Sequence, residues 1–349
     1  EIFGHLTFCG SIFTLVYAGA APEMNKSGTV IIVTHNSAGT ISDCLESLAI
    51  SDDEISFLTI VVDNCSSDET VEIVERKFSD VHLIKSPENG GFAAGNNQGI
   101  AQSYGDWIFF LNPDATITPH TITLLSQQLK LSDSIGIIAP KIMDANGKVT
   151  ISYFPFLTFW TSAWIALGLQ RLLPVNKADG RWNFSKNPAD QTIVVDRVIG
   201  AAMMANRRAI TEIGGFDRIY FLFSEEEDLC QRLNRAGWKS LYFPGAEVRH
   251  IGGASMHESR SISIAAANWS RYLYLRKFHS EGVVELSRLI WIFGLLIRLL
   301  GALMIPHRLR RNGVVKGYIL SLKSLLSPGY FDRVLRPKRF DVKSESRIV

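Results

Sequence analysis

Four consecutive acidic residues, Glu225 to Asp228, follow the aromatic run Tyr220–Phe223. Carboxylates are costly to bury without partners, whereas the dipole of a helix favours acids in its first turn. The run is therefore either the solvated start of a helix or a group of acids directed into a cleft. Leu229 and Leu233 favour a helix with one face packed inward. A carboxylate that faces a cleft can remove a proton from a hydroxyl group, so the run predicts a general base.

Asp114 and His250 are two further candidates for a functional site. Asp114 follows the apolar run Trp107–Leu111, and its oxygens could hold Mg²⁺ or Mn²⁺, although Asn112-Pro113-Asp114 also makes a good turn. His250 ends a strand-like run before the glycine-rich Ile251–Ser255. A lone histidine is usually structural, but this position also suits a ligand of a metal or a phosphate.

The elements that must position these groups alternate from Thr29 onward. Apolar runs predict strands at 29–34, 58–63, 82–85 and 107–111, and helical patterns predict helices at 41–48, 71–78 and 94–104. Ser37 and Thr40 resemble N-cap residues of the first helix, and residues 66–69 those of the second. This is the β-α-β order of a parallel sheet. Ligands bind at the carboxyl ends of such strands, where three polar clusters fall that could also be simple turns: Thr34-His35-Asn36, Asp63-Asn64 and Asn112 to Asp114.

Residues 151–190 interrupt this alternation with aromatic side chains separated by prolines. The insertion is either an ordinary helix packed on the core or a wall for an apolar or lipid-linked acceptor, and the composition favours neither. Its aromatic residues are Phe154, Phe156, Phe159, Trp160, Trp164, Trp182 and Phe184.

The two ends of the chain differ from its body. Residues 1–27 form an N-terminal segment in which Ile2–Ala21 is apolar and has no basic region before it. The position of Met24 suggests that residues 1–23 lie upstream of the natural start. Residues 281–349 form a basic, apolar and helical extension, in which residues 282–349 hold 13 Lys and Arg against 4 Asp and Glu. The four scattered cysteines predict free thiols in a reducing compartment.

Leu289–Ile305 is an apolar run that is interrupted by Arg298 and followed by the cations of residues 307–311. A run this short, with a cation inside it, favours a helix that lies in a membrane interface rather than one that crosses the bilayer. The alternative is a helix buried against the catalytic domain. Aromatic spacing suited to stacking on nucleic acid is absent, so we expect no nucleic-acid partner.

An ordered set of motifs indicates a family. Val61 to Asp68, Asn89 to Asn97, Leu111 to Asp114, Gly215 to Arg232 and Val248 to His250 together resemble family 2 glycosyltransferases, particularly the bacterial rhamnosyltransferase-like branch, over about residues 28–280. The resemblance implies an α/β GT-A fold, a nucleotide-diphospho-sugar donor, a divalent metal (Mg²⁺ or Mn²⁺) and inversion at the anomeric carbon.

The resemblance also implies roles at the acidic motifs. Asp114 occupies the last position of the D-x-D metal motif, and Asn112 at its first position leaves one metal-binding carboxylate, so strong metal binding is not expected. The Glu-Asp pair of the family aligns with Glu225-Glu226, which makes Glu226 the expected base, with Glu225 and Glu227 as alternatives.

The remaining roles concern the donor and the acceptor. Asp63 is expected to contact the donor base, and Asn96 with the Gly90-Gly91 loop is expected to line the nucleoside site. Asp228 and Arg232 match a D-L-x-x-R pattern that suits a structural salt bridge or contacts with acceptor and phosphate. The full donor set is Thr34, His35, Asn36, Asp63, Asn64, Gly90, Gly91, Phe92, Asn96, Asn112 and Asp114, and the acceptor set is Asp228, Arg232 and Trp238.

The expected function is sugar transfer, with L-rhamnose from dTDP-rhamnose as the leading donor, to a saccharide or lipid-linked acceptor in the synthesis of cell-surface polysaccharide. We expect a cytoplasmic enzyme, peripheral on the inner face of the cell membrane. A non-catalytic polysaccharide-assembly or binding protein is one alternative. A sugar nucleotidyltransferase is the other, but it would carry a G-x-G-x-R-type loop where this chain has Thr34 to Ser37.

Overall fold

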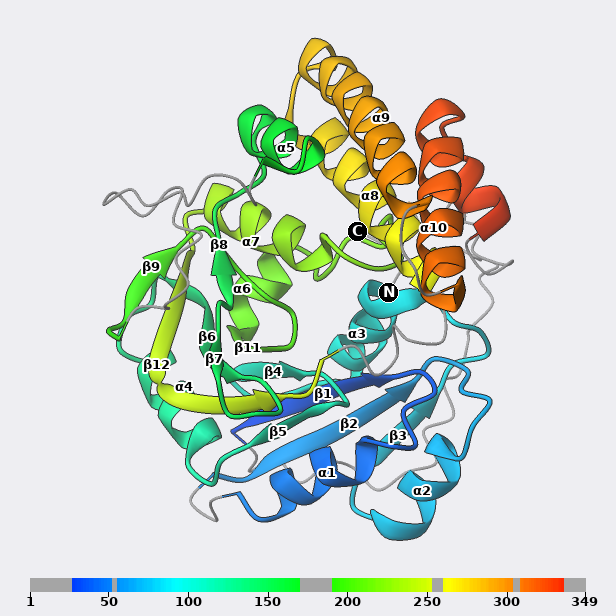
Figure 1. Cartoon of the computed structure of the whole chain (residues 1–349). Helices are drawn as coiled ribbons and strands as arrows, with labels where there is room; N and C mark the ends of the chain where they lie inside the picture. The colour runs from blue at the N-terminus through cyan, green and yellow to red at the C-terminus, as the bar shows by residue number, and fades with distance from the viewer. Residues whose placement is uncertain (1–26, 52–54, 170–189, 253–259, 304–307, 336–349) are drawn as a thin grey trace, which may run out of the picture.

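A mixed sheet forms the centre of the protein (Figure 1). The computed structural model describes residues 27–51, 55–169, 190–252, 260–303 and 308–335. In the first half of the sheet four parallel strands lie in the order β3-β2-β1-β4, as the alternating pattern predicted. These strands and their helices are β1 (Gly28–Thr34), α1 (Ile41–Ala49), β2 (Phe57–Asp63), α2 (Thr70–Lys77), β3 (His82–Lys85), α3 (Gly91–Gln102) and β4 (Trp107–Leu111).

The second half of the sheet changes direction at β11, which lies antiparallel between β4 and β6. β12 runs parallel to β6 and pairs antiparallel with β5 and β9. The short strands β8 and β10 form a separate antiparallel ribbon. The bounds are β5 (Ala115–Ile117), β6 (Ile135–Met143), β7 (Val149–Thr150), β8 (Tyr153–Phe154), β9 (Ile193–Val195), β10 (Arg197–Val198), β11 (Ala202–Asn206) and β12 (Lys239–His250).

Helices cover both faces of this sheet. Apolar residues of α1, α2 and α4 (Thr121–Leu129) pack on one face, and those of α3, α6 (Arg207–Glu212) and α7 (Glu225–Arg235) pack on the other. The strands between them are almost wholly buried, as expected for a sheet that is covered on both sides. The result is a three-layer α/β architecture.

Two local expectations were wrong. Thr40 makes no side-chain cap hydrogen bond at the start of α1. At α2, by contrast, Asp68 of the expected residues 66–69 accepts the N–H of Thr70, and it also accepts the N–H of Ala38, so its carboxylate joins the two helix starts. Helix α3 begins at Gly91, three residues before the predicted start. Gly91 has φ +82°, and a Cβ there would lie 2.0 Å from the carbonyl oxygen of Phe221, so this tight approach requires glycine.

A bundle of helices lies above the sheet in Figure 1. It consists of α5 (Phe159–Ala166), α8 (Arg260–Phe278), α9 (Glu281–Leu303), α10 (Arg308–Leu326) and a π-helical turn (Phe331–Leu335). Trp269, Trp291 and Leu295 form its own apolar cluster, which Tyr220 joins from the loop before α7. The bundle is thereby packed onto the helix that carries the acidic run.

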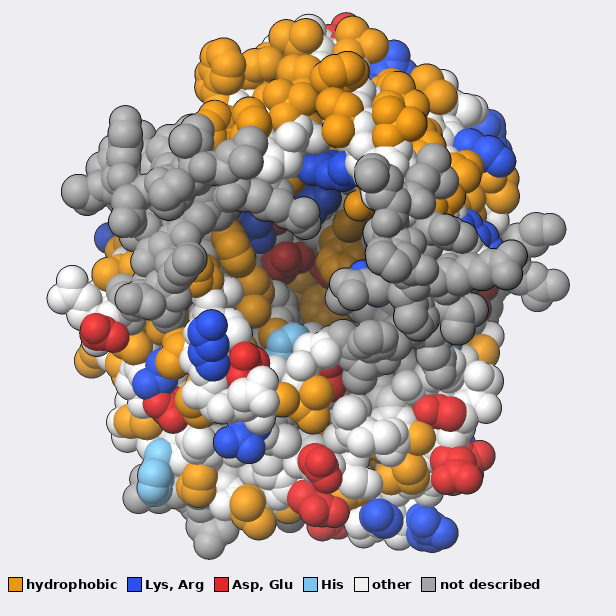
Figure 2. Space-filling model, viewed as in Figure 1, with side chains coloured by type: hydrophobic (Ala, Val, Ile, Leu, Met, Phe, Trp, Pro, Cys, Tyr) orange, Lys and Arg blue, Asp and Glu red, His pale blue; other side chains and the backbone are white. Residues whose placement is uncertain are grey.

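Helix α9 has two apolar faces. Val284, Trp291 and Leu295 are buried in the bundle, while the opposite face is open, with six large side chains between 46% and 68% exposed. Figure 2 shows hydrophobic side chains gathered over this region, at the top of the view. Of the helices that the structure describes, none is long and apolar enough to cross a membrane. The exposed side chains are Leu286, Leu289, Phe293, Leu296, Ile297 and Leu300.

Several expectations fall outside the described residues. These are the N-terminal segment up to residue 26, Trp182 and Phe184 of the aromatic insertion, the loop from Gly253 to Ser255 and the side chains of the cations at 307–311. Within the described part of that insertion, α5 packs against α9, while Trp160 is 70% exposed. Cys44, Cys65 and Cys230 are free thiols, as predicted for the cysteines that the structure describes.

Candidate active site

The polar residues after β1 and β2 meet at the carboxyl edge of the sheet. Thr34 and Asp63 are register partners, and the Thr34 hydroxyl donates to the Asp63 carboxylate at 3.0 Å. The N–H of Ser66 donates to the same carboxylate at 2.9 Å, so Asp63 is buried and organises the loop after β2. The His35 Nδ1 atom lies 3.0 Å from the carbonyl oxygen of Asn64, and the Asn36 side chain accepts the N–H of Ser67.

The loop of Gly90 and Gly91 is fixed between this edge and the loop that precedes α7. The Asn64 amide donates to the carbonyl of Gly91 at 3.0 Å, and the N–H of Phe92 donates to the carbonyl of Phe221 at 3.1 Å. Asn96 is buried and donates to the carbonyl of Phe92 at 3.0 Å. The loop expected to hold the donor and the segment that leads to the expected base therefore form one connected unit.

Asp114 and His250 lie side by side because β5 pairs with β12. The register sets His250 opposite Ala115, and the His250 Nε2 atom is 3.0 Å from the Asp114 Oδ1 atom. The Asn112 Nδ2 atom is 3.4 Å from the same imidazole nitrogen. The two expected metal ligands, Asp114 and His250, are thus together, with Asn112 beside them.

The chemistry of this trio fits partial coordination of a hard cation. One carboxylate oxygen, one imidazole nitrogen and one amide are too few for Mg²⁺ or Mn²⁺, which take about six ligands, so a phosphate ligand and water would supply the others. Consistently, the described residues contain no group of three or more His, Cys, Asp and Glu side chains suited to a metal.

The four acids in the first turn of α7 have different surroundings. Glu225 is buried, and burial, followed by the charge of Glu226, raises its pKa well above the usual range. Glu227 accepts the N–H of Leu157 at 2.7 Å and lies 3.5 Å from the Arg197 Nε atom. Glu226 keeps 15% of its side chain exposed, with the Arg197 Nη1 atom 3.7 Å away. Burial raises the pKa of Glu226 and the charge of Arg197 opposes that rise.

Asp228 is fully buried in a network of structural contacts. The Arg232 Nε atom lies 2.6 Å and the Lys277 Nζ atom 2.5 Å from its carboxylate, and the Tyr220 hydroxyl donates to it at 3.4 Å. Arg232 also donates to the carbonyls of Ile213 and Gly215. Of the two roles expected for Asp228 and Arg232, these contacts match the structural salt bridge.

Trp238, expected near the acceptor, lies beyond the C-terminal end of α7, at the opposite end of the helix from Glu226. Its indole is 6% exposed, its N–H donates to Glu212 at 3.0 Å, and the guanidinium of Arg208 lies 5.4 Å from its ring centroid. These are the contacts of a core residue rather than of an acceptor ligand.

Comparison with known proteins shows which family the first half of the chain matches. Residues 29–174 match the model of glycosyl transferase family 2. The chain carries a family 2 glycosyltransferase domain. It is 27% identical to an N-acetylglucosaminyl-diphospho-decaprenol L-rhamnosyltransferase of Mycobacterium tuberculosis, over 81% of this chain and 94% of that protein. It is also 27% identical to the rhamnosyltransferase WbbL of Escherichia coli K12, over 71% of this chain and 92% of that protein.

Solved structures agree on the fold. The mannosyltransferase PcManGT from Pyrobaculum calidifontis, in complex with GDP-Man and Mn²⁺, has a TM-score of 0.51 at 15% identity and covers 88% of this chain and 89% of its own. GalNAc-T7 with UDP, GalNAc and Mn²⁺ has a TM-score of 0.54 at 14% identity, and the match covers 90% of this chain and 59% of the GalNAc-T7 chain. These structures confirm the predicted GT-A fold. The match over residues 29–174 and the rhamnosyltransferase relatives confirm the enzyme class of a glycosyltransferase.

Two residues to which the sequence assigned no role support this arrangement, one beside the acidic run and one in the frame around it. Arg197, which contacts Glu226 and Glu227, comes from the short strand β10, where its Nε atom donates to the carbonyl of Pro155. Asn97 holds both backbone groups of Phe216, at 2.8 and 2.9 Å, and thereby ties α3 to the segment before α7. Arg197 stands in no local pattern that indicates such a role, whereas Asn97 is the last residue of the motif Asn89 to Asn97.

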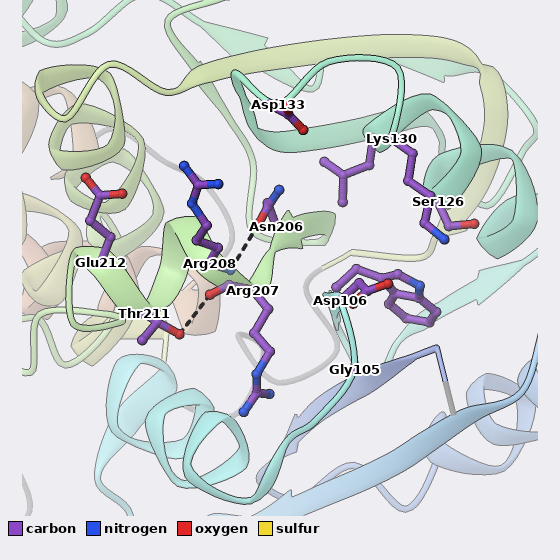
Figure 3. A pocket seen from close by; sticks show the side chains of 12 residues that line it. Gly105, Asp106, Ser126, Lys130, Asp133, Asn206, Arg207, Arg208, Thr211 and Glu212 are labelled. Carbon is purple, nitrogen blue, oxygen red and sulfur yellow. Dashed lines mark hydrogen bonds between the residues drawn. The ribbon is translucent and has the colours of Figure 1, made fainter. Parts of the chain in front are cut away.

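A cavity of about 760 Å³ lies at the other end of the strands (Figure 3). It is lined by residues of the start of β4, the end of β11 and the helices α4 and α6, among them Asn206 of β11 and Arg208 of α6. Both acidic and basic side chains line it. None of the predicted site residues lines it. The site predicted at the carboxyl edge of the sheet and the start of α7 therefore lies apart from this cavity.

Proposed function

We propose that this glycosyltransferase moves L-rhamnose from a nucleotide-diphospho-sugar to a hydroxyl group of a lipid-linked saccharide, with inversion at the anomeric carbon. The sugar and the lipid-linked acceptor are supported by the names of two relatives, an L-rhamnosyltransferase that acts on a diphospho-decaprenol substrate and the rhamnosyltransferase WbbL. The product would enter cell-surface polysaccharide.

The observation that carries the mechanism is the environment of Glu226. Of the three glutamates in the acidic run, Glu225 is buried and Glu227 is held by Leu157 and Arg197, whereas Glu226 is the most exposed. A raised pKa makes a carboxylate a stronger base once it has lost its proton. In our proposal Glu226 accepts the proton of the acceptor hydroxyl as that oxygen attacks the anomeric carbon.

One displacement accounts for the stereochemistry. The bond between the acceptor oxygen and the anomeric carbon forms while the bond from that carbon to the donor phosphate oxygen breaks, and the nucleoside diphosphate leaves with the bonding electrons. Attack from the face opposite the leaving group inverts the configuration. A single carboxylate base is sufficient for this route, since no covalent sugar-enzyme intermediate has to form.

The leaving diphosphate is assigned to the edge of β5 and β12. Asp114 and His250 would hold Mg²⁺ or Mn²⁺ there, with Asn112 beside them. Such a cation, when bound, neutralises charge that develops on the leaving phosphates. The Mn²⁺ in the complexes of PcManGT and GalNAc-T7 supports a divalent cation on this fold. The nucleoside would lie at Asp63, Asn64 and the Gly90-Gly91 loop.

The exposed face of α9 supports association with a membrane surface. Its six large apolar side chains lie on one side of the helix, and Lys316 and Lys323 are exposed on the neighbouring α10. An apolar face next to cations favours the interface of an anionic leaflet. We place the enzyme on the cytoplasmic face of the membrane, where it would meet both a soluble nucleotide sugar and a lipid-linked acceptor.

The decisive experiment compares Glu226→Gln with the wild type. Loss of a general base lowers turnover by about 10²- to 10⁴-fold, while the donor should still bind, as measured by a thermal shift with dTDP-rhamnose and Mn²⁺. Glu72→Gln, an exposed position on α2, is the matched control. Full turnover of Glu226→Gln would refute the proposal. The configuration of the new bond, determined by NMR of the product, tests inversion.

A further inference from the structure

Two residues with an unusual backbone conformation precede the acidic helix α7. Phe223 has φ +70° and Ser224 has φ +64°, so both lie in the left-handed region. This region is unfavourable for residues that carry a Cβ, and a bulky residue such as phenylalanine is rarely found there. Among the non-glycine residues that the structure describes, only Asn36 and Cys65 also have positive φ, and those two stand singly. Backbone strain is therefore concentrated directly before the turn of helix that carries Glu226.

The serine of this turn gives no capping benefit. Ordinary N-cap residues have an extended backbone, and their side-chain oxygen accepts an N–H of the first helical turn. Ser224 is the N-cap residue of α7, but its backbone is left-handed and its hydroxyl makes no cap hydrogen bond. The side chain of Phe223 packs partly buried against the apolar cluster of the bundle, which accounts for a phenylalanine but not for its backbone. Local stability therefore does not explain the turn.

Three different elements hold the chain around this turn. The carbonyl of Phe221 accepts the N–H of Phe92 at 3.1 Å, which joins it to the loop expected to hold the donor. The carbonyl of Leu222 accepts the hydroxyl of Ser270 on α8 at 2.8 Å. The carbonyl of Ser224 accepts an N–H of the first turn of α7 at 2.9 Å. Because the chain has to meet all three partners within a few residues, its surroundings enforce the strained conformation.

The turn determines which acid of α7 is open to the site. Successive residues of a helix point about 100° apart, so a shift of the start of α7 by one residue would exchange Glu226 for one of its neighbours. In the observed structure Glu225 and Glu227 are buried, whereas Glu226 keeps 15% of its side chain exposed. The rotation of the helix at its first turn therefore selects Glu226.

Glu226 also lies close to the loop expected to hold the donor. A Cβ built at Gly200 would lie 3.5 Å from the Phe92 ring and 3.8 Å from the Cβ atom of Glu226. Phe92 and Glu226 therefore border the same residue of the segment between β10 and β11. The N–H of Phe92 also holds the carbonyl of Phe221 before the turn. One residue of the donor loop thus contacts the chain that enters the turn and lies near the side chain that the turn directs.

We propose that Phe223 and Ser224 are positioning residues, whose strained turn sets the rotation of α7 and thereby holds Glu226 beside the donor loop. This inference rests on the proposed function, since it concerns the placement of the proposed base. Neither residue has to touch the substrate in this role. Strain that lowers stability persists at such a place because a small displacement of a catalytic group lowers the rate strongly.

Ser224→Gly is the test, because glycine adopts positive φ without steric strain but also frees the turn to leave it. Glycine normally lowers stability by enlarging the unfolded ensemble. Relief of strain should offset this effect, so the urea midpoint of Ser224→Gly should equal or exceed that of the wild type. With the donor that supports turnover of the wild type, kcat should fall about ten- to a hundredfold, since a displacement of about 1 Å can cost that much. The KM for the donor should change little.

Two further variants are compared with Ser224→Gly. Ser224→Ala keeps a Cβ and therefore the restricted backbone, so it should lose less turnover than the glycine variant. Equal losses in both would assign the effect to the hydroxyl and overturn the proposal. Ser132→Gly, at an exposed serine in the turn before β6, is the matched control, and it should lower the urea midpoint while kcat stays unchanged.

The remaining outcomes separate this proposal from the proposed function. A Ser224→Gly enzyme with the kcat of the wild type would show that the turn does not position the base. A urea midpoint that falls as far as that of Ser132→Gly, or failure of Ser224→Gly to fold, would show that the turn is not strained. Full turnover of Glu226→Gln would refute the proposed function itself. An inactive Glu226→Gln together with a fully active Ser224→Gly would refute the positioning role alone.

Discussion

Replacing Arg197 by glutamine should shift the pH dependence of sugar transfer. The Arg197 Nη1 atom lies 3.7 Å from Glu226, with the two side chains 20% and 15% exposed. Burial raises the pKa of Glu226 and the Arg197 cation opposes that rise. Removal of the cation therefore leaves burial without its main opposing effect, and the pKa of Glu226 should rise further.

The size of the shift follows from the separation and the exposure. An opposite charge at this distance moves the pKa of a carboxylate by about 1–3 units, and partial exposure to water reduces the effect toward the lower part of that range. We expect a rise of about 1–2 units. A base acts in its deprotonated form, so activity appears as pH rises through its pKa. The acid limb of kcat/KM should accordingly move to higher pH by the same amount.

The assay is the pH profile of kcat/KM for the wild type, Arg197→Gln and Arg197→Lys. The lysine variant keeps the charge and should move the limb less than the glutamine variant. Circular dichroism must show that the variants are folded, because Arg197 also contacts Glu227. A folded Arg197→Gln enzyme whose acid limb coincides with that of the wild type would contradict our reasoning that Glu226 is the titrating base.

Three further outcomes are expected. Gly91→Ala should lower the free energy of unfolding, measured in urea, by at least about 2 kcal/mol, because the residue has a positive φ and a Cβ would clash with the carbonyl oxygen of Phe221. Gly39→Ala is the control and should lose far less, since a Cβ there meets open space. Asp114→Asn should weaken Mn²⁺-dependent binding of dTDP about tenfold or more, and unchanged binding would exclude Asp114 from the metal site. Phe293→Glu on the exposed face of α9 should reduce co-sedimentation with anionic vesicles, and identical sedimentation would rule that face out as the contact.

Truncation after Gly282 would also remove the apolar C-terminal helix, but Phe293→Glu is the sharper test of membrane association. Helix α9 buries Val284, Trp291 and Leu295 in the bundle, and the bundle packs on the loop before α7 through Tyr220. Truncation would therefore disturb the proposed active site as well as the proposed membrane contact. Substitution on the exposed face changes the proposed membrane contact alone.

The sequence by itself determined the first half of the sheet. The predicted strands at 29–34, 58–63, 82–85 and 107–111 agree with β1 to β4 to within one residue, because strands covered on both faces are short continuous apolar runs. The ordered motifs also determined the family, and they brought Asp114 and His250 into one hypothesis before their proximity was known. These features are encoded locally, or in the order of local signals along the chain.

The tertiary structure decided what each charged residue meets. The run Glu225 to Asp228 is chemically almost uniform, yet packing buries Glu225, gives Asp228 to Arg232 and Lys277, and leaves Glu226 partly open beside Arg197. The two faces of α9 were likewise separated by the bundle rather than by composition. The physical reason is that burial and charge pairing depend on elements distant in the chain, and they set exposure and pKa for residues that the sequence cannot distinguish.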